Sequence, residues 1–510
     1  MRLKSLLFII FVFSILSATI QAATYNILDF GAKGDGKFVN SKAINDAVSK
    51  CIHDGGGTVL IPPGTFVTGC IILKSHVNLH LEPGAELLGS ENMEDYKVNN
   101  ERHGIIFCED AINVSISGSG TINGNGSHFY ESDKNHVYDE FDKSRTRQKE
   151  NYMPEGTFFT DGPLERKAMP GMTIVFFHCT NVSVTGITIR DTPIWATRFG
   201  YCDGLLIDGV TIKNNILIPN SDGIHTTVSR NIRISNCNIV AGDDAIVVTG
   251  FPKDEDTPEF NSADQEAHTY GNKTIYAENV TVTNCQLKSS SSGIRIGYGQ
   301  HPIRRCTFSN IVIYDSQRGI GIFAHDASNI EDLIFSDIII ETRLLNGQWW
   351  GHGEPIHLSC ISRFPGQVAG QIKNVQFNNI NAIGEQGILV YGQKESPMEN
   401  IQFNNVQLRM RKGKETMGYG GNFDLRPASD KSMRMFEHDI PGIYAQNVNK
   451  LDVRNFNLSW GNDLPSFFTH GIECKDVTDL LIDGFTGTAN PNASGSQKIK
   501  LENSHYRNDK

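Results

Sequence analysis

The chain has 510 residues, with 46 Lys and Arg against 57 Asp and Glu, and a formal net charge of −11. No long run of one charge sign occurs, so the basic footprint of a nucleic-acid-binding protein is absent and we expect no DNA or RNA partner. The 10 cysteines are dispersed without a CxxC pair or Cys/His cluster, which indicates neither a zinc site nor a dense disulfide framework.

Residues 1–22 predict a cleaved signal peptide. Arg2 and Lys4 precede an apolar stretch from Leu6 to about Leu16, and small residues follow it. No later stretch reaches the roughly 18 apolar residues needed to cross a bilayer. We therefore expect an exported protein, secreted or periplasmic, with no membrane span.

Short β-type alternations recur through the rest of the chain. Examples are NVSVTGITI from Asn181, NIRISNCNI from Asn231, CTFSNIVI from Cys306 and IQFNNVQL from Ile401. A sequence repeat with a period between about 20 and 50 residues indicates a solenoid. Within each unit, apolar and polar residues alternate with a period of two, which excludes helical repeats. We predict an all-β fold over residues 23–490, a right-handed parallel β-helix that forms a single-stranded solenoid of roughly ten coils.

A second repeat lies between these units, as in SDGIH from Ser221, DDAIVV from Asp243, SGIRIG from Ser292 and RGIGIF from Arg318. We interpret it as another strand of each coil, so that equivalent residues on successive coils stack about 4.8 Å apart. Matching Asn and Cys positions, such as Cys237 and Cys285, are expected to form ladders that face inward; the alternative for the cysteines, which we prefer, is that they are small buried apolar side chains.

Polar segments interrupt the repeat near 124–172, 251–273 and 410–440. Structureless loops of such length are uncommon unless they are functional or disordered. We hypothesise that the first two wall off a cleft and favour attack on chain ends; the alternative is mobile surface decoration. Residues 491–510 are expected to form a weakly ordered tail.

Three carboxylates stand at one-coil spacing, because Asp243 and Asp244 lie 21 and 22 residues after Asp222. Asp beside Gly is common in turns, but like charges side by side raise each other's pKa, which suggests a functional site. Two chemistries fit: acid/base cleavage of a glycosidic bond, or a Ca²⁺ site in a lyase with Arg or Lys as the base.

The opening segments FGAKGDGKFVNSKAINDAV and GGGTVLIPPGTFVTGCIIL, together with NSDG and AGDDAI, resemble family 28 of the glycoside hydrolases, the polygalacturonase family. This resemblance implies a β-helix that hydrolyses α-glycosidic bonds in pectic polysaccharides or oligosaccharides, with inversion and without a metal or other cofactor. It implies that Asp243 is the general acid and that Asp222 and Asp244 hold and activate the water.

Two family motifs are altered. Ser292 stands where the family has the His of G-H-G, and Gly321 and Phe323 replace the Arg and Lys of R-I-K. We hypothesise that Arg295, in the same phase one coil earlier, supplies the lost basic contact; the alternative is an exposed sheet arginine. Rhamnogalacturonan hydrolases of the family also lack the His motif, so both polygalacturonan and rhamnogalacturonan remain open as substrates.

Four further residues are predicted to contact substrate: His225, beside Asp222; Trp350 and Glu354, in GQWWGHGEPIHL; and His325, in IFAHDAS. The structural alternatives are buried histidines and a tryptophan pair that caps the core. Rival functions are a Ca²⁺-dependent β-helix lyase, a non-catalytic glycan-binding β-helix, and a hydrolase of the same fold on a non-pectic polysaccharide. We expect a monomer.

Overall fold

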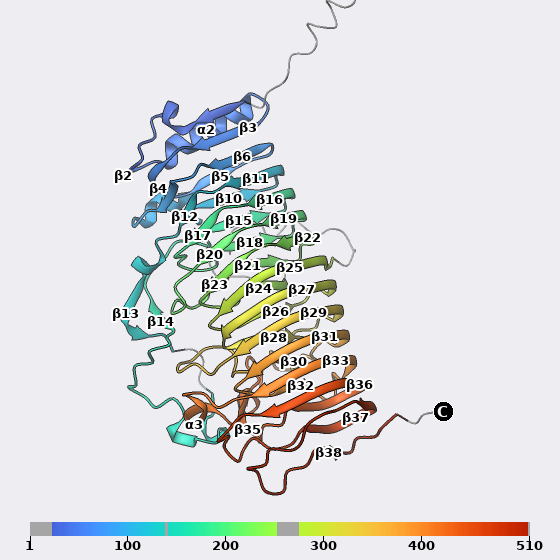
Figure 1. The fold of residues 1–510 in the computed structure, drawn as a ribbon. Helices are drawn as coiled ribbons and strands as arrows, with labels where there is room; N and C mark the ends of the chain where they lie inside the picture. Colours follow the sequence, from blue (N-terminus) through green and yellow to red (C-terminus); the bar gives the residue numbers. More distant parts are fainter. Residues whose placement is uncertain (1–22, 138–140, 252–274, 508–510) are drawn as a thin grey trace, which may run out of the picture.

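The computed structural model describes residues 23–137, 141–251 and 275–507. The fold is a right-handed parallel β-helix, as predicted, whose coils stack from the N-terminal to the C-terminal end (Figure 1). The predicted signal peptide and nearly all of the 251–273 insertion lie outside the described residues. Among the described residues, no helix has the length and apolar character needed to span a bilayer.

The first ladder of parallel strands carries one strand from nearly every coil. Its members are β5 (Ile71–Leu73), β10 (Ile106–Glu109), β15 (Ile174–Phe177), β18 (Thr197–Gly200), β21 (Ile224–Thr227), β24 (Ile246–Gly250), β26 (Ser292–Gly299), β28 (Arg318–Phe323), β30 (Ile356–Cys360) and β32 (Ile388–Gly392). It continues through β36 (Ile443–Trp460), β37 (Ile472–Asp483) and β38 (Ile499–Glu502). This ladder has more rungs than the roughly ten coils predicted.

Two further ladders complete the early coils. One contains β1 (Thr24–Asn26), β3 (Gly57–Ile61), β6 (Val77–Leu81), β11 (Ile112–Gly118), β16 (Thr180–Thr185), β19 (Asp203–Asp208) and β22 (Arg230–Ser235). The other contains β2 (Asp35–Val39), β4 (Gly64–Thr68), β7 (Ala85–Gly89), β12 (Thr121–Asn123), β17 (Thr188–Arg190), β20 (Thr211–Lys213) and β23 (Asn238–Ala241).

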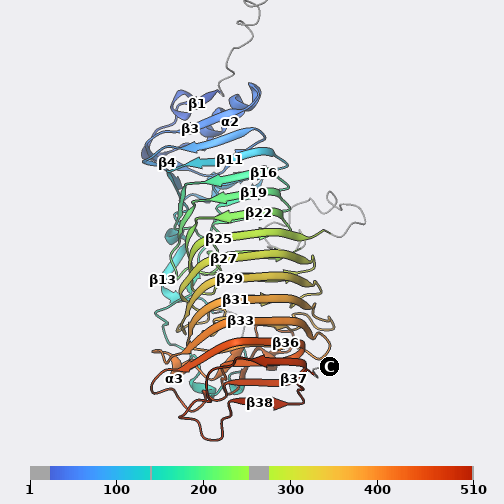
Figure 2. The same cartoon turned by 45° about the vertical axis from the view of Figure 1, so that its right-hand side comes forward.

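In the later coils these two ladders merge into long strands, because β22 and β23 both pair with β25. The long strands are β25 (Ala277–Ser289), β27 (Ile303–Ser316), β29 (Ile330–Thr342), β31 (Ile372–Gly384) and β33 (Met398–Met410), followed by β36 and β37. Figure 2 shows them stacked in order down one side of the molecule.

Helices are few. They are α2 (Ser41–His53), α3 (Thr416–Tyr419) and α4 (Lys431–Arg434), with the 3₁₀ turns η1 (Ile27–Phe30), η2 (Met93–Tyr96), η3 (Gly126–Phe129), η4 (Lys143–Arg145) and η5 (Lys149–Asn151). The antiparallel pairs are β8 (Lys97–Val98) with β9 (Glu101–Arg102), β13 (Tyr130–Asn135) with β14 (Leu164–Arg166), and β34 (Asn422–Asp424) with β35 (Met435–Glu437). Helix α2 lies at the N-terminal end of the stack, where it packs against β1, β3 and β5.

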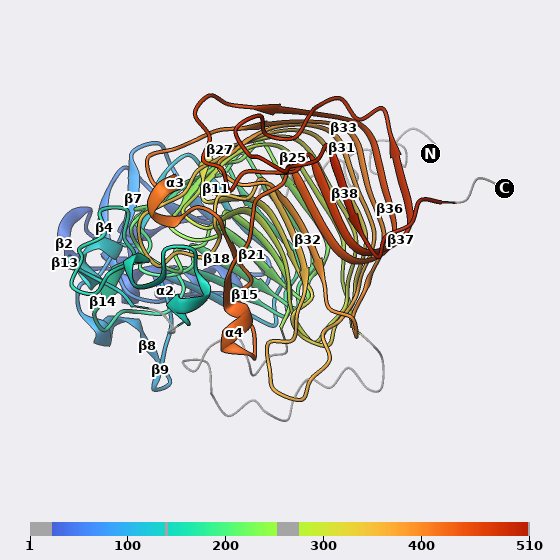
Figure 3. The ribbon, with the colours of Figure 1, turned by 90° about the horizontal axis from the view of Figure 1, so that it is seen from below.

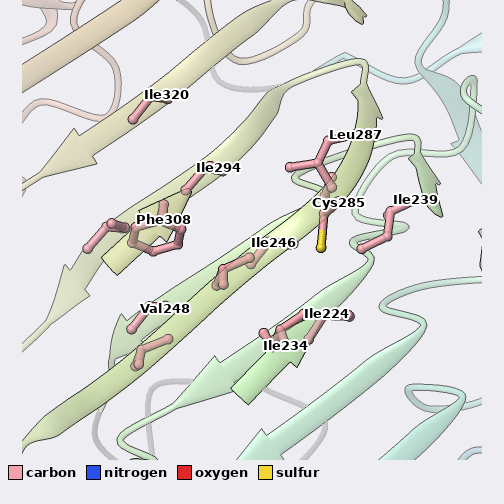
Figure 4. Packing of buried hydrophobic residues seen from close by; sticks show 14 of the residues in the cluster. Ile224, Ile234, Ile239, Ile246, Val248, Cys285, Leu287, Ile294, Phe308 and Ile320 are labelled. Atoms are coloured by element: carbon pink, nitrogen blue, oxygen red, sulfur yellow. The ribbon is translucent and has the colours of Figure 1, made fainter. Parts of the chain in front are cut away.

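The hydrophobic core runs along the axis of the solenoid. It consists of columns of buried side chains that occupy equivalent positions on successive coils. Ile224, Ile246, Ile294 and Ile320 occupy equivalent positions on four successive coils and are fully buried (Figure 4). Such β-branched side chains fit a pleated sheet that packs on one face. The first isoleucine of the second sequence repeat, as in SGIRIG and RGIGIF, therefore takes the inward position of the first ladder.

The Asn positions differ from the predicted inward ladders. Asn279 donates to Asn231 at 2.9 Å, and Asn400 donates to Asn374 at 2.9 Å, but the chain at these bends is exposed or half-buried. Their φ values of 54–58° place the backbone in the left-handed region that Asn tolerates. The Asn ladders thus fix the bends, whereas the cysteines are buried inside.

Two of the predicted insertions meet on one side of the β-helix. From β13, the chain after residue 141 runs past several coils to lie beside α3 and β35 (Figure 1), and Figure 3 shows β13, β14, α3 and α4 on the same side. Arg147 N donates to Asn422 Oδ1 at 2.6 Å, and Trp349 Nε1 donates to Asp161 O at 2.8 Å. We call residues 141–161 the strap.

At the C-terminal end, β38 pairs with β37 in parallel. Residues 499–502 therefore extend the sheet inside the segment that the sequence indicated as a weakly ordered tail.

Candidate active site

The three aspartates precede neighbouring strands of the first ladder. Because Ile224 of β21 pairs with Ile246 of β24, Asp222 and Asp244 hold the same position on adjacent coils. Gly223 N donates to Asp244 O at 2.9 Å, which joins the two turns directly. The structure thus brings the carboxylates together, as their spacing predicted, and leaves each of them 2–4% exposed.

Each carboxylate has its own hydrogen-bond partners. Asp243 Oδ2 accepts from the backbone N of Asn220 at 3.2 Å and from its Nδ2 at 3.1 Å. Asp244 Oδ1 accepts from the backbone N of Ser292 at 3.0 Å, and its Oδ2 accepts from Arg295 Nε. The Arg295 Nη2 atom also lies 3.9 Å from Asp222 Oδ2, so one guanidinium contacts two of the three carboxylates.

Burial is the largest cause of the shifted pKa values of Asp222 and Asp243. Burial, together with the charge of Asp244, raises the pKa of Asp243 to about 7, although Arg295 opposes the shift. Burial and the charges of Asp243 and Asp244 raise the pKa of Asp222 well above its usual range. A carboxyl that still holds its proton near neutral pH is what general acid catalysis requires.

A pocket of about 360 Å³ opens beside these residues. Its lining includes Asp244, Arg295 and Trp350, so two of the predicted substrate contacts face it. Trp350 is half-buried, and its ring lies 5.0 Å from the Arg426 guanidinium. The volume falls at the small end of the range for ligand pockets, which is about 300–1,000 Å³.

His225 does not fit the predicted substrate contact, because its side chain is 0% exposed. Its ring stacks on Trp195 with 3.7 Å between centroids. Its Nδ1 lies 3.2 Å from Asp222 Oδ2, and its Nε2 lies 3.3 Å from Thr249 Oγ1. Burial lowers its pKa well below the usual value, so a neutral imidazole holds Asp222 from behind the pocket.

Glu354 and His325 also lie behind the wall, each 0% exposed, and so differ from the predicted substrate contacts. Glu354 Oε2 lies 3.5 Å from Arg318 Nε, and the same oxygen accepts from His352 N at 2.6 Å. His325 Nε2 lies 2.7 Å from Ser359 Oγ, and burial lowers the pKa of His325 to about 3. Glu354 therefore holds Arg318 in place, and His325 holds Ser359.

Three arginines that line the pocket were missed by sequence reasoning: Arg318, Arg363 and Arg426. Arg318 pairs in register with Ser292 on the preceding coil, so the repeat itself carried a signal for it. Arg426 follows β34 in the irregular 410–440 segment, where no period marks it.

Comparison with known proteins identifies the family of the chain. A model of the family described as glycosyl hydrolases family 28 matches residues 51–331. The chain belongs to this family.

One similar protein is a probable polygalacturonase of Vitis vinifera. It is 28% identical over 246 residues, which are 45% of this chain and 44% of that protein. Polygalacturonase-2 of Solanum lycopersicum is 23% identical over 385 residues, 71% of this chain and 75% of that protein. An exopolygalacturonase of Zea mays is 25% identical over 283 residues, 54% and 62% of the two chains. The chain therefore spans less than half of the grape protein and three quarters of the tomato protein.

Solved structures show the same fold. The exopolygalacturonase of Thermotoga maritima superposes with a TM-score of 0.63 at 20% identity, over 86% of this chain and 93% of that one. The family 28 exopolygalacturonase of Yersinia enterocolitica gives 0.62 at 19% identity, over 91% of this chain and 79% of that one.

Proposed function

We propose that the protein is an inverting hydrolase of α-glycosidic bonds in a pectic polysaccharide or oligosaccharide of the polygalacturonan or rhamnogalacturonan type. The observation that carries this is the buried carboxylate trio beside a sugar-sized pocket, in which Asp243 has a pKa of about 7. Family membership supports the reaction, and relatives named polygalacturonase and exopolygalacturonase support the pectic substrate.

Asp243 is the proposed general acid. It donates its proton to the glycosidic oxygen as the bond to the anomeric carbon breaks, while a water attacks that carbon from the opposite face. Asp222 and Asp244 hold this water, and one of them takes its proton. Arg295 contacts both carboxylates and offsets their negative charge.

The position that a Ca²⁺ ion would take in a lyase is the space shared by Asp222 and Asp244. The Arg295 guanidinium already occupies this space, because it contacts both carboxylates. This contact favours the hydrolase over the Ca²⁺-dependent lyase.

Attack on chain ends is the proposed mode. Trp350 and Arg426 stand at the pocket on segments held by the strap and by the 410–440 insertion. In this proposal these two side chains block the passage of a long polymer through the site. Release of only internal fragments by the purified enzyme would contradict this mode.

Product analysis tests the function. The purified protein is incubated with polygalacturonan, rhamnogalacturonan I, their oligosaccharides and non-pectic polysaccharides, beside Asp243→Asn. We expect saturated products of inverted configuration from a pectic substrate, with a loss of at least about 10²-fold in the variant, as for removal of a general acid. Unsaturated products that vanish with a chelator would indicate the lyase, and cleavage of non-pectic glycans alone would reassign the substrate.

Export and a monomeric state are part of the same proposal. Cell fractionation should find the mature chain, without residues 1–22, in the periplasm or medium. Light scattering on the purified chain should give the mass of one copy. A cytoplasmic pool that keeps residues 1–22, or a mass of two copies, would contradict these points.

A further inference from the structure

A second pocket lies at the opposite edge of the first ladder from the aspartates. Its volume is about 500 Å³, and among the described residues it shares no lining residue with the pocket beside Asp244. Asp222 precedes β21, whereas Val228, which lines the second pocket, follows it. Because these two residues are separated by a strand of extended chain, the second pocket lies up to about 20 Å from the aspartates.

A third pocket, of about 410 Å³, continues the second toward the N-terminal end of the stack. Asp110 lines the third pocket and His178 lines the second, and they follow the paired strands β10 and β15. Asp110 Oδ1 lies 3.7 Å from His178 Nδ1. We call the two pockets together the bend groove, because they follow the bend between the first ladder and the ladder that contains β16, β19 and β22.

The bend groove runs along the axis of the solenoid. Its lining begins at Lys74, after β5, and reaches Val228, after β21. The strands β5, β10, β15, β18 and β21 pair in this order (Figure 1). With about 4.8 Å between neighbouring strands, the groove is about 19 Å long. This length suits a linear chain of sugars rather than a single ring.

Aromatic rings line the bend groove at intervals. Phe107, Tyr201 and Tyr276 are each half-buried. The Tyr201 ring lies 5.4 Å from the His178 ring, and the Arg304 guanidinium lies 3.6 Å from the centre of the Tyr276 ring, so both tyrosines are held in place. A tyrosine combines a flat apolar ring with a polar hydroxyl, which suits the apolar face and the hydroxyls of a sugar.

The charges around the second pocket are balanced. Arg230 pairs with Asp203 at 2.8 Å. Arg304 pairs with Glu278 at 2.7 Å. These groups carry several N–H donors and oxygen acceptors, which can bind the hydroxyls of a sugar.

The third pocket is acidic. Its lining includes three carboxylates and one lysine, which are Glu101, Glu109, Asp110 and Lys74. Like charges placed opposite each other suppress the binding of an anionic partner. The bend groove therefore disfavours a chain of uronic acids and favours an uncharged chain.

A buried imidazole in the third pocket can accept one more hydrogen bond. His103 lines the pocket and is 6% exposed, and its Nδ1 atom has no hydrogen-bond partner among the described residues. Burial lowers the pKa of His103 below its usual value, so the ring is neutral at pH 7. A sugar hydroxyl both donates and accepts, so it suits this nitrogen in either tautomer.

We propose that the bend groove is a second glycan-binding site, which holds an uncharged, hydroxyl-rich polysaccharide along the solenoid axis across Phe107, Tyr201 and Tyr276. This site goes beyond the proposed hydrolysis, because it binds a glycan without cleaving it. Its role is to keep the enzyme on an uncharged region of polysaccharide while the aspartates act on another region.

Affinity gel electrophoresis tests the site. The gels contain galactan, arabinan or xyloglucan as three uncharged probes, and Asp243→Asn is the parent protein, so that the proposed hydrolysis does not alter the probe. Tyr276→Ala removes one ring of the groove from this parent. Tyr506→Ala is the matched control, because it removes a tyrosine that is 49% exposed near the C-terminus and does not line the groove.

We expect at least one uncharged probe to retard the parent and the control. Tyr276→Ala should bind that probe more weakly by about fivefold or more, within the range for loss of an aromatic contact. Both variants should melt at the same temperature, so that misfolding does not explain the difference. No retardation by any of the three probes, or equal retardation of Tyr276→Ala and the control, would overturn the second site.

Cleavage of trigalacturonate separates the second site from the proposed reaction. With Asp243 intact, Tyr276→Ala should keep the native kcat/KM on this short substrate, because the bend groove lies away from the aspartates. A loss of kcat/KM that parallels the loss of binding would refute a separate site. Retardation by an uncharged probe that depends on Tyr276, in a protein that cleaves no pectic substrate, would support the second site and refute the proposed function.

Discussion

Arg295 shows how three neighbouring carboxylates coexist in a buried turn. Its Nε donates to Asp244, and its Nη2 lies 3.9 Å from Asp222. A buried charge is tolerated when it is paired and hydrogen-bonded. This guanidinium lines the pocket and also contacts two aspartates, so it is neither the exposed sheet arginine of the alternative interpretation nor a side chain without protein partners.

The titration of Asp243 predicts how activity depends on pH. Because the acid must carry a proton, kcat should fall as pH rises through about 7, the pKa of this buried carboxyl. A kcat profile on the active pectic substrate measures it. A flat profile between pH 6 and pH 9 would mean that Asp243 is not the acid.

The same shift has the opposite consequence for stability. The folded-state pKa of Asp243 lies above the unfolded value of 3.8, so folded protein binds more protons between these values and its stability falls as pH rises through that window. Asp243→Asn should therefore be more stable than native protein at pH 8, by on the order of 1–4 kcal/mol, and nearly equal at pH 4. Urea unfolding at both values measures this, with exposed Asp463→Asn as the control. A variant less stable than native at pH 8 would contradict it.

At the scale of elements, the site is one register position repeated along the first ladder. Asp222, Asp244, Ser292, Arg318 and Glu354 each stand two residues before the buried isoleucine of their strand. Along the column the side chains are therefore carboxylate, carboxylate, hydroxyl, cation and carboxylate. The same scaffold position supplies two of the proposed catalytic carboxylates at one end and Glu354, the ion-pair partner of Arg318, at the other.

Two carboxylates of this column, Asp222 and Glu354, are each followed three residues later by a histidine. His225 Nδ1 lies 3.2 Å from Asp222, and His357 Nδ1 lies 3.4 Å from Glu354. The sequence shows both pairs, as SDGIH and GEPIH, but it does not say whether the side chains face a ligand or pack behind it. For this reason the adjacency of the aspartates was predictable, whereas the burial of His225, His325 and Glu354 was not.

The strap is an element whose role the sequence left open. Its inner side packs in a small separate cluster that contains Phe141, Tyr152 and Tyr419. The Tyr152 ring is 1% exposed and meets Phe141 and Tyr419 edge-on at 5.4 and 5.5 Å. This cluster joins the 124–172 insertion to the 410–440 insertion beside the pocket.

Tyr152→Ala should release the strap. Loss of a buried aromatic side chain costs about 3–5 kcal/mol, and here the loss falls on the docking of the strap. We expect faster proteolysis within residues 141–161 and, on polygalacturonan or the active pectic substrate, products that shift from end-derived sugars toward longer fragments. Tyr152→Phe keeps the ring and is the control. Faster proteolysis with unchanged products would show that the strap does not set the mode of attack.

At the scale of the whole molecule, the solenoid is a stack in which each coil contacts mainly its neighbours. Inside it, the rings of Phe308, Phe335, Phe377 and Phe403 are stacked with centroids 4.9–5.1 Å apart. These residues come from β27, β29, β31 and β33, which Figure 2 shows in sequence order. In such repeat architectures, stability is close to a sum over coils and the interfaces between them.

This one-dimensional order explains which features the sequence predicts. A fixed period identifies coils, and one-coil spacing brings Asp222 beside Asp244, because both are properties of neighbouring repeats. Arg426 reaches the same pocket from 182 positions further along the chain than Asp244, on a segment without a period. Its place depends on how the 410–440 insertion folds back, which no local pattern records.

Phe335→Ala tests the nearest-neighbour character of the stack. The ring lies between Phe308 at 4.9 Å and Phe377 at 5.0 Å, so its removal leaves a cavity that touches two interfaces and should cost about 3–5 kcal/mol. Hydrogen exchange should show the loss of protection concentrated in β27, β29 and β31, while the N-terminal strands β10 and β15 keep theirs. Phe335→Leu, which refills most of the volume, should lose far less. Protection lost evenly along the chain would mean that the coils unfold as one cooperative unit, and the picture of a stack of separable coils would have to be abandoned.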